Sequence, residues 1–389
     1  MPSGIDTLVR GILSCAPDDL EYTLFGATSD LRERPIGKVV SLVLGNRTIR
    51  YLPLVWMDST AARGRVPLIA RYVWALHRLA SLGELRKFDV LDFHRIEPVA
   101  LFRNGQQSKN ILLHQDMSVL RSANSDIMWR HAPWLYEAIE RRLFDRLDRI
   151  FAVRRSAVER YQLLYPQFAD KFAFLPTWFD DTIFRPNQSS EAGAQLKAQV
   201  LAELGIHGPR RLLITVGRLD HQKNPMLLLQ AFRELCERET DLHLLMVGDG
   251  GLRGSVVAAL KAANLQAHVS LLGVKGPADI AGLLRASDLF VLSSAYEGMP
   301  IAVLEALACG TPVASTDVGE IRLIVKPGEN GQISAAGTAA ALAAAMSKAL
   351  QGLERSRGAP CVQSVLPYRP EKVLSVVYDN HRRQAAARP

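Results

Sequence analysis

The half of the chain after residue 210 alternates short apolar runs with segments of helical apolar spacing, and this alternation constrains the fold more than any other feature. The first run, Arg211–Val216, ends at Gly217 and a polar loop, and Pro225 then opens a helical segment. Further strands are predicted at Leu242–Val247, Val269–Leu272, Leu289–Ser293 and Pro312–Ser315, and further helices at Val256–Ala263, Asp279–Ala286 and Pro300–Ala308. This order predicts a parallel, doubly wound α/β sheet, whose ligands bind at the carboxyl ends of the strands.

The N-terminal half has longer and less regular segments. Strands are predicted at Tyr22–Phe25, Val39–Leu44, Val90–Phe93, Ile111–Leu113 and Ile150–Ala152. Helices are predicted at Thr7–Ser14, Pro67–Leu82, Pro133–Asp148 and Ser156–Tyr165. These segments indicate a second α/β domain with longer insertions, and 389 residues suffice for two domains with a core each.

Composition narrows the class of protein. Hydrophobic residues make up 48% and charged residues 22%, as in a folded chain. The four cysteines include no close pair, which argues against a disulfide framework or a zinc site and favours a reducing compartment. The sequence has neither an apolar run long enough to span a membrane nor the features of a signal peptide, so we expect a cytoplasmic protein. The net charge of +8 suits phosphate-bearing ligands or anionic lipid, and without a basic run we expect no nucleic-acid partner.

The stretch AYEGMPIAVLEALACGTPV, residues 295–313, places one glutamate in a loop and another in the helix behind it. Pro300 suits the first position of that helix, and the free backbone N–H groups there form an anion site. Gly298 permits close approach of a ligand to the backbone. Glu297 can reach a polar group beside a bound phosphate, and Glu305, two turns into the helix, can accept hydrogen bonds from vicinal hydroxyls such as those of a ribose. A nucleoside diphosphate joined to a sugar offers all of these groups.

The loop GRLDHQKNP, which follows the first strand of this half, carries two cations, Arg218 and Lys223. Both are expected to point to the same edge of the sheet and to suit a diphosphate. A solvated loop is the alternative. No Asp-x-Asp occurs in the chain, so the metal–diphosphate bridge that such a motif supports has no counterpart here.

The segments GRL-x5-NP, MVGDGGLR and LLGVKGPADIAGLLRASDLFVLSSAYEGMPIAVLEALACGTPVASTDVGE resemble the donor-nucleotide domain of GT-B glycosyltransferases. More narrowly, they are similar to the retaining enzymes of glycosyltransferase family 4, the group 1 glycosyltransferases, and the similarity covers about Arg211 to Val325. The resemblance implies an α/β protein of the GT-B class, with two Rossmann-like domains that face a cleft. It also implies a retaining, hexosyl-type transfer from a nucleotide diphospho-sugar, with no metal and no other cofactor required.

The resemblance also implies roles for individual residues. Arg218 and Lys223 would neutralise the diphosphate leaving group, Glu305 would hold the ribose, and Glu297 would contact the transferred sugar. Backbone N–H groups after Gly298, those of Met299 and Ile301 on either side of Pro300, would bind the distal phosphate or the sugar. Val274 matches a position that meets the base.

Two N-terminal features match the same family. His114, in ILLHQD and at the end of a predicted strand, matches a histidine that faces the donor sugar and the acceptor, although a purely structural histidine is the alternative. Gly4, in PSGIDTLVRGIL, matches the glycine loop that approaches the diphosphate. The family has a strand before that loop, so we expect either that the natural protein begins upstream or that this domain has lost a central strand.

Two domains are predicted. The first contains residues 1–180, with the terminal helix 370–383 packed on it, and the second contains residues 181–365.

Arg71, Trp74 and Arg78 fall on one face of the predicted helix Pro67–Leu82. Such a face suits anionic lipid headgroups or a lipid-linked acceptor, in which case the protein would be peripheral on the inner face of the membrane. A solvated helix with Trp74 partly packed is the alternative. We therefore expect the acceptor to be a glycan or a lipid-linked molecule, that is, a lipid-linked or polysaccharide precursor.

Two other functions fit the same donor site. A GT-B-fold nucleotide-sugar epimerase would bind the donor but need no acceptor cleft. A non-catalytic nucleotide-sugar-binding relative would bind the donor without turning it over.

Overall fold

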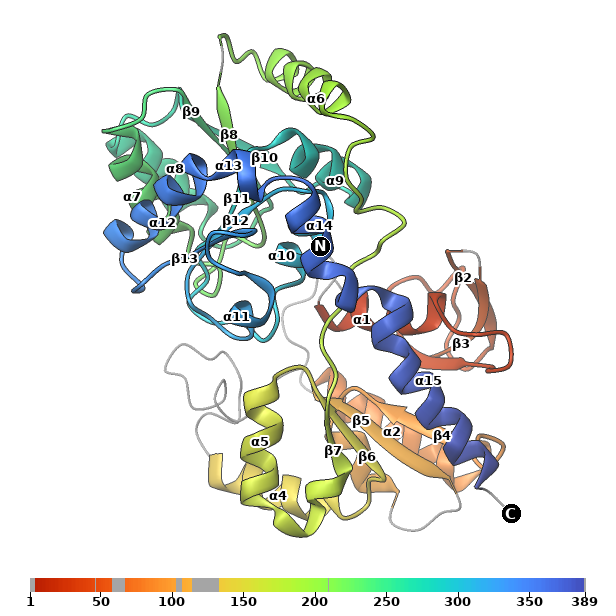
Figure 1. Ribbon diagram of the computed structural model, residues 1–389. Helices are drawn as coiled ribbons and strands as arrows, with labels where there is room; N and C mark the ends of the chain where they lie inside the picture. Colours follow the sequence, from red (N-terminus) through yellow and green to blue (C-terminus); the bar gives the residue numbers. More distant parts are fainter. Residues whose placement is uncertain are drawn as a thin grey trace. The chain divides into compact units, whose positions relative to one another are not determined.

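The computed structural model describes residues 4–45, 47–57, 67–102, 107–113, 133–208 and 210–387. The chain divides into two compact units. Figure 1 colours the chain from red at the N-terminus to blue at the C-terminus, so that each unit can be followed by its residues. One unit contains residues 176–372, and the other contains residues 2–175 together with 373–389. Each unit is an α/β body, and we describe each by itself.

The unit of residues 176–372 is built on a six-stranded sheet with the order β10-β9-β8-β11-β12-β13, in which every pairing is parallel. The strands are β8 (Arg211–Val216), β9 (Leu242–Val247), β10 (Val269–Gly273), β11 (Leu289–Leu292), β12 (Val313–Ser315) and β13 (Gly331–Ile333). From β8 the chain steps outward to β9 and β10, and it then returns to β11 on the other side of β8. The strand order therefore reverses between β8 and β11, which is where sheets of this kind bind ligands.

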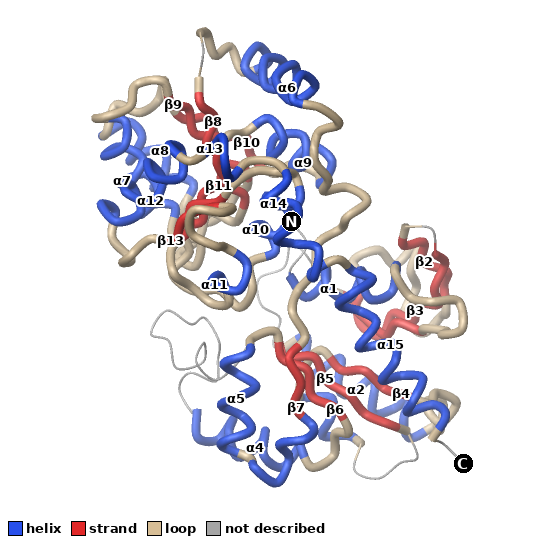
Figure 2. Tube along the Cα trace, in the orientation of Figure 1, coloured by secondary structure: helices blue, strands red, loops and turns tan. Residues whose placement is uncertain are grey.

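Helices cover both faces of this sheet, as Figure 2 shows in blue around the red strands. The helices are α6 (Ser190–Glu203), α7 (Pro225–Cys236), α8 (Arg253–Ala262), α9 (Pro277–Ala286), α10 (Ile301–Ala308), α11 (Ile321–Ile324), α12 (Ala339–Gln351), α13 (Leu353–Ser356) and α14 (Ala359–Val365). Side chains alternate along β8, so that Leu212 and Ile214 join the core under α9, α10 and α14, whereas Leu213 joins the core under α7, α8 and α12. Burial on both faces explains the continuous apolar runs of these strands.

The described strands of the other unit form two sheets. One has the order β1-β3-β2, from β1 (Thr23–Thr28), β2 (Val40–Leu44) and β3 (Arg47–Trp56), with β1 parallel and β2 antiparallel to β3. The other is parallel, with the order β4-β5-β6-β7, from β4 (Val90–Phe93), β5 (Ser108–Leu113), β6 (Arg149–Ala152) and β7 (Phe172–Phe174). The two sheets share one core, in which Leu54 and Val55 of β3 join Ile111 of β5 and Ile150 of β6.

The helices of this unit are α1 (Gly4–Ser14), α2 (Leu68–Ser81), α4 (Pro133–Phe144), α5 (Arg155–Leu164) and the terminal α15 (Pro370–Ala386). In the described residues, no helix is both long enough and apolar enough to cross a membrane. Strands β3, β7 and β13 have no counterpart among the predicted strands, and β1 extends three residues beyond the predicted Tyr22–Phe25.

Helix α15 connects the two sheets of this unit through polar side chains, and Figure 1 shows it in dark blue beside α1 and β4. His381 Nδ1 lies 2.8 Å from the hydroxyl of Tyr22, next to β1, and His381 Nε2 lies 2.8 Å from Asp92 Oδ2 of β4. Gln384 and Asn110 of β5 exchange two hydrogen bonds of 2.8 and 2.9 Å. Burial alone would raise the pKa of Asp92, but the neighbouring His381 and Asn110 hold it below its usual range. The last helix of the chain is therefore part of the framework of the N-terminal unit.

We predict that His381→Ala destabilises this unit by about 1–3 kcal/mol, because it removes the partner of the half-buried Tyr22 hydroxyl and the imidazole beside Asp92. Chemical unfolding followed by circular dichroism measures the change. The control is Arg382→Ala, on the same helix, which removes an exposed pair with Asp19 and should cost much less, because exposed ion pairs contribute little to stability. Equal effects of the two substitutions would contradict the connecting role of His381.

Candidate functional site

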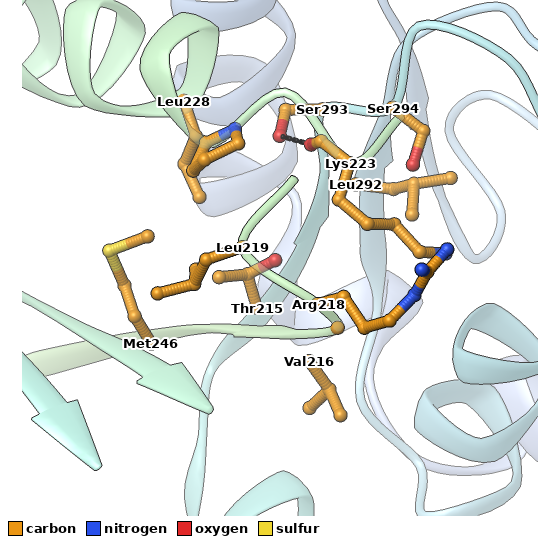
Figure 3. A pocket seen from close by; sticks show the side chains of 12 residues that line it. Thr215, Val216, Arg218, Leu219, Lys223, Leu228, Met246, Leu292, Ser293 and Ser294 are labelled. Atoms are coloured by element: carbon orange, nitrogen blue, oxygen red, sulfur yellow. Dashed lines mark hydrogen bonds between the residues drawn. The ribbon is translucent and has the colours of Figure 1, made fainter. Parts of the chain in front are cut away.

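Two loops meet at the carboxyl ends of the adjacent strands β8 and β11. One loop, residues 217–224, leads from β8 into α7, and the other, residues 293–300, leads from β11 into α10. Ala295 N donates to Gln222 O at 2.8 Å, Gln222 Nε2 donates to Tyr296 O at 3.3 Å, and Ser293 Oγ donates to Lys223 O at 2.8 Å. Figure 3 shows this last bond at a small hollow, with Arg218 and Lys223 extending to the same side. The two loops are therefore one connected structure.

Glycines allow neighbouring loops to approach these two. A side chain at Gly248, which has a φ of +133°, would place its Cβ 1.8 Å from Gly217 O. A side chain at Gly319, with a φ of +56°, would place its Cβ 2.2 Å from Gly298 O, and Glu320 N donates to that same carbonyl at 2.9 Å. No side chain fits at such distances, so both positions require glycine. The loops after β9 and β12 thus support the loops that carry the predicted site.

Lys223 and Glu297 form an ion pair that spans the two loops. Lys223 Nζ lies 2.6 Å from Glu297 Oε1, and the two side chains are 24% and 8% exposed. Ser294 Oγ donates to the same Oε1 at 2.7 Å. Removing either partner would leave a charge with little access to water, which is costly. The structure thus brings together two of the residues predicted for the site.

Arg218 belongs to the same loop as Lys223 but is 61% exposed. Its guanidinium lies 3.0 Å from Asp220 Oδ2 and donates to Gln222 Oε1 at 3.2 Å. Asp220 Oδ1 also accepts from Lys223 N at 3.0 Å, so one carboxylate orders the backbone of the loop and contacts its outer cation. Each of the two predicted cations therefore has an acidic partner in the structure.

Glu305 lies in α10 and is half-buried. Burial, together with the negative charge of Asp180, raises its pKa to about 7, and the positive charge of Lys223 partly opposes the rise. Asp180 follows Thr177, whose hydroxyl donates to Met299 O at 3.3 Å, so this segment packs on the loop before α10. Asp180 itself is exposed, and its Oδ1 accepts from Thr182 N at 3.0 Å. Glu305 thus belongs to the same electrostatic environment as Lys223.

The other predicted donor residues are distributed around this centre. Met299 and Pro300 are buried, and α10 begins at Ile301, so Gly298 and these residues form the turn into the helix. Val274 follows β10, two strands away from β8 at the edge of the sheet, and is 55% exposed. Gly4 is the first residue of α1 in the other unit, and His114 lies outside the described residues. The site described here is therefore formed by residues of one unit only.

Three further residues of the site are absent from the sequence prediction. Ser294, Asp220 and Asp180 each contact or polarise a predicted residue, as given above. Asp220 lies inside the GRLDHQKNP loop, so its place between Arg218 and Lys223 was a signal in the sequence. Ser294 and Asp180 come near Glu297 and Glu305 only in the folded chain, and no spacing in the sequence indicates them.

Comparison with known proteins matches residues 197–357 to the family "Glycosyl transferases group 1". N-acetyl-alpha-D-glucosaminyl L-malate synthase from Bacillus anthracis is 31% identical over 302 residues, which is 77% of this chain and 75% of that protein. D-inositol 3-phosphate glycosyltransferase from Segniliparus rotundus is 29% identical over 185 residues, 46% of this chain and 39% of that protein. The match thus spans about two fifths of the length of this second relative.

Two solved structures have a similar fold. Sucrose-phosphate synthase from Thermosynechococcus elongatus superposes with a TM-score of 0.79 at 18% identity, covering 99% of this chain and 94% of that one. HepE from Anabaena, in complex with UDP-glucose, gives a TM-score of 0.68 at 15% identity, covering 98% of this chain and 97% of that one. The α/β fold of this chain is therefore that of GT-B glycosyltransferases, as predicted.

We predict that the ionisation of Glu305 lowers the free energy of unfolding of its unit as the pH rises from about 4.3 to about 7. Its folded-state pKa of about 7 lies above the usual value near 4.3, so the protonated carboxyl stabilises the folded state at low pH. That contribution is lost as the pH rises through 7 and amounts to at most about 4 kcal/mol. Unfolding free energies measured across this range should depend less on pH in Glu305→Gln than in the wild type.

The matched control is Glu329→Gln, which neutralises an exposed glutamate of the same unit and should leave the pH dependence unchanged. Identical pH profiles for Glu305→Gln and the wild type would show that Glu305 ionises like a surface carboxyl.

Proposed function

The chain belongs to the group 1 glycosyl transferases, and we propose that it moves a hexosyl-type sugar from a nucleotide diphospho-sugar to an acceptor with retention of anomeric configuration. The observation that carries this proposal is the position of Lys223, Glu297, Arg218 and Glu305 around the point where the strand order reverses. Two cations and two carboxylates at the carboxyl edge of a parallel sheet suit a ligand that has both phosphates and hydroxyls.

The cations act on the leaving group in this proposal. Negative charge builds on the diphosphate as the bond between sugar and phosphate breaks, and Lys223 and Arg218 stabilise that charge. The backbone N–H of Lys223 donates to Asp220 Oδ1 at 3.0 Å, so the loop from which the lysine side chain extends is ordered without a ligand. The ammonium lies 2.6 Å from Glu297 Oε1, at the same edge of the sheet. The proposed reaction needs no metal or other cofactor.

The carboxylates contact hydroxyl groups of the donor. Glu305 accepts from the ribose and Glu297 from the transferred sugar, while the turn from Gly298 to Ile301 presents its backbone to the distal phosphate or sugar. The exposed Val274 meets the base. The roles that the resemblance implies for His114, toward the donor sugar and the acceptor, and for Gly4, toward the diphosphate, stay predictions. The names of the relatives support sugar transfer, and the HepE complex with UDP-glucose supports a nucleotide-sugar donor.

The acceptor is proposed to be a lipid-linked or polysaccharide precursor, and a surface of α2 supports this proposal. Arg71, Trp74, His77, Arg78 and Leu82 recur at helical spacing and are all exposed. Trp74 is 66% exposed, although it is large and apolar. The opposite side of α2 packs against the core, since Leu76 is buried and Tyr72 donates to Phe25 O at 3.2 Å.

The charges of this α2 surface match an anionic membrane. Helix α2 contains no acidic residue, and among the described residues Arg71, His77 and Arg78 have no acidic partner. Basic side chains near an anionic bilayer contribute about 1 kcal/mol each, and tryptophan favours the membrane interface. We therefore propose peripheral attachment of the protein to anionic lipid through α2.

Donor turnover tests the proposed function. We expect one nucleotide diphospho-sugar in a donor screen to release its nucleoside diphosphate in the presence of lipid-linked or free glycan acceptors, with EDTA present or absent. NMR of the product should show the anomeric configuration of the donor. Lys223→Ala should lower turnover by about a hundredfold, since it removes a cation from a developing negative charge. Lys261→Ala, an exposed lysine on α8, should have no effect.

Inversion of configuration, loss of activity in EDTA with rescue by a divalent metal, or wild-type kinetics in Lys223→Ala would each contradict the mechanism. Conversion of the donor sugar without any acceptor would indicate an epimerase instead, and binding without turnover would indicate a non-catalytic protein.

Vesicle flotation tests the membrane contact. The wild-type chain should float with vesicles that contain anionic phospholipid and not with zwitterionic vesicles. Arg71→Ala and Arg78→Ala should each weaken binding about fivefold, as expected for about 1 kcal/mol per basic residue. The control pair Arg32→Ala and Arg50→Ala removes two exposed arginines of the same unit and should have less effect. Failure of the wild type to bind anionic vesicles would sink this part of the proposal.

A further inference from the structure

The two carboxylate oxygens of Glu297 have different surroundings. Oε1 accepts from Ser294 Oγ at 2.7 Å and lies 2.6 Å from Lys223 Nζ. Among the described residues, no side chain or backbone group donates to Oε2. The carboxylate is therefore anchored through one oxygen, and the other is available to a ligand.

The charges of the site require a change of partners when a diphosphate arrives. Lys223 is paired with Glu297 and Arg218 with Asp220, so these four side chains sum to zero charge. A diphosphate brings at least two negative charges next to two carboxylates, and this is favourable only if the cations turn toward it. Lys223 is the more buried cation, and its ammonium has to shift from Glu297 to a phosphate oxygen. Glu297 then loses one of its two anchors.

Ser294 is the anchor that remains. The residue lies in the loop two positions after the end of β11 and is only 1% exposed. Its carbonyl oxygen accepts from Thr316 Oγ1 at 2.8 Å, and Thr316 N donates to Leu292 O at 2.9 Å, so the neighbouring loop after β12 fixes its backbone. A hydroxyl held in this way offers a hydrogen bond of fixed direction, whereas the lysine ammonium sits on a flexible chain.

We propose that Ser294 is a positioning residue that keeps Glu297 Oε1 in place while Lys223 turns to the diphosphate, so that Glu297 Oε2 faces the transferred sugar. This inference rests on the proposed function and specifies how the site works. It separates two tasks: Lys223 changes partner when the donor binds, and Ser294 does not. The adjacent Ser293 has a different task, because its hydroxyl holds the backbone of Lys223 at 2.8 Å.

Ser294→Ala tests the proposal through two separate readouts. Loss of a hydrogen bond to a charged group should lower kcat by about ten- to a hundredfold. The affinity for the free nucleoside diphosphate, measured by calorimetry, should stay within about twofold of the wild type, because that ligand has no sugar for Glu297 to contact. Ser294→Thr keeps the hydroxyl and should recover most of the lost kcat. Ser287→Ala, which removes another fully buried serine hydroxyl of the same unit, should leave kcat unchanged.

The outcomes separate this inference from the proposed function. Wild-type kcat in Ser294→Ala overturns the inference alone. So does a loss of nucleoside diphosphate affinity that parallels the loss of kcat, because a merely structural serine would give that result. Failure of the wild-type chain to bind or turn over any nucleotide-sugar overturns the proposed function, and the inference with it.

Discussion

The ion pair between Lys223 and Glu297 is the interaction on which the architecture of the site depends. It connects two loops that are far apart in the sequence, since Lys223 and Glu297 are separated by 74 residues. The pair exists because β8 and β11 are neighbours in a parallel sheet, so that the loops after both strands emerge at the same edge. Because Glu297 is nearly buried, the pair also fixes which directions its carboxylate and the lysine ammonium take.

The sheet makes this pair possible through backbone contacts that only glycine allows. Gly248 and Gly319 bring the loops after β9 and β12 against the carbonyl oxygens of Gly217 and Gly298. Four loops therefore support one pair of charged side chains. The N-terminal unit is stabilised differently, since its two described sheets share an apolar core and are also connected by polar side chains of α15. Close packing of loops thus holds the candidate site in place, whereas α15 holds together the two described sheets of the N-terminal unit.

The sequence allowed the donor-side unit to be predicted better than the other one. Its central strands are buried on both faces, so β8, β9 and β11 appear as largely apolar runs. Strand β3 was missed because arginines and a proline interrupt its apolar residues. Strands β7 and β13 were also missed, and each has only three residues; β12 is as short, but the alternation of strands and helices indicated it. The packing of α15 between Tyr22 and Asp92 depends on contacts between residues far apart in the sequence, and Tyr22 and His381 are separated by 359 residues.

The charged residues of the site were predictable for the same reason, and their pairing was not. Arg218, Lys223, Glu297 and Glu305 lie at fixed offsets from strand ends, which the sequence shows. That each cation is already neutralised, by Glu297 and by Asp220, follows only from the folded loops. The contacts of Ser294 and Asp180 also follow only from the folded structure. The Ser294 hydroxyl points at Glu297 because of the turn after β11, and Asp180 belongs to a segment outside the sheet.

The most direct test of this account is a crystal structure of the chain with a bound nucleoside diphosphate. The account predicts a phosphate oxygen within hydrogen-bonding distance of Lys223 Nζ, an increased distance between that nitrogen and Glu297 Oε1, and an unchanged hydrogen bond from Ser294. A nucleotide bound away from the ends of β8 and β11, or an intact pair of Lys223 and Glu297 with no phosphate beside it, would contradict the account.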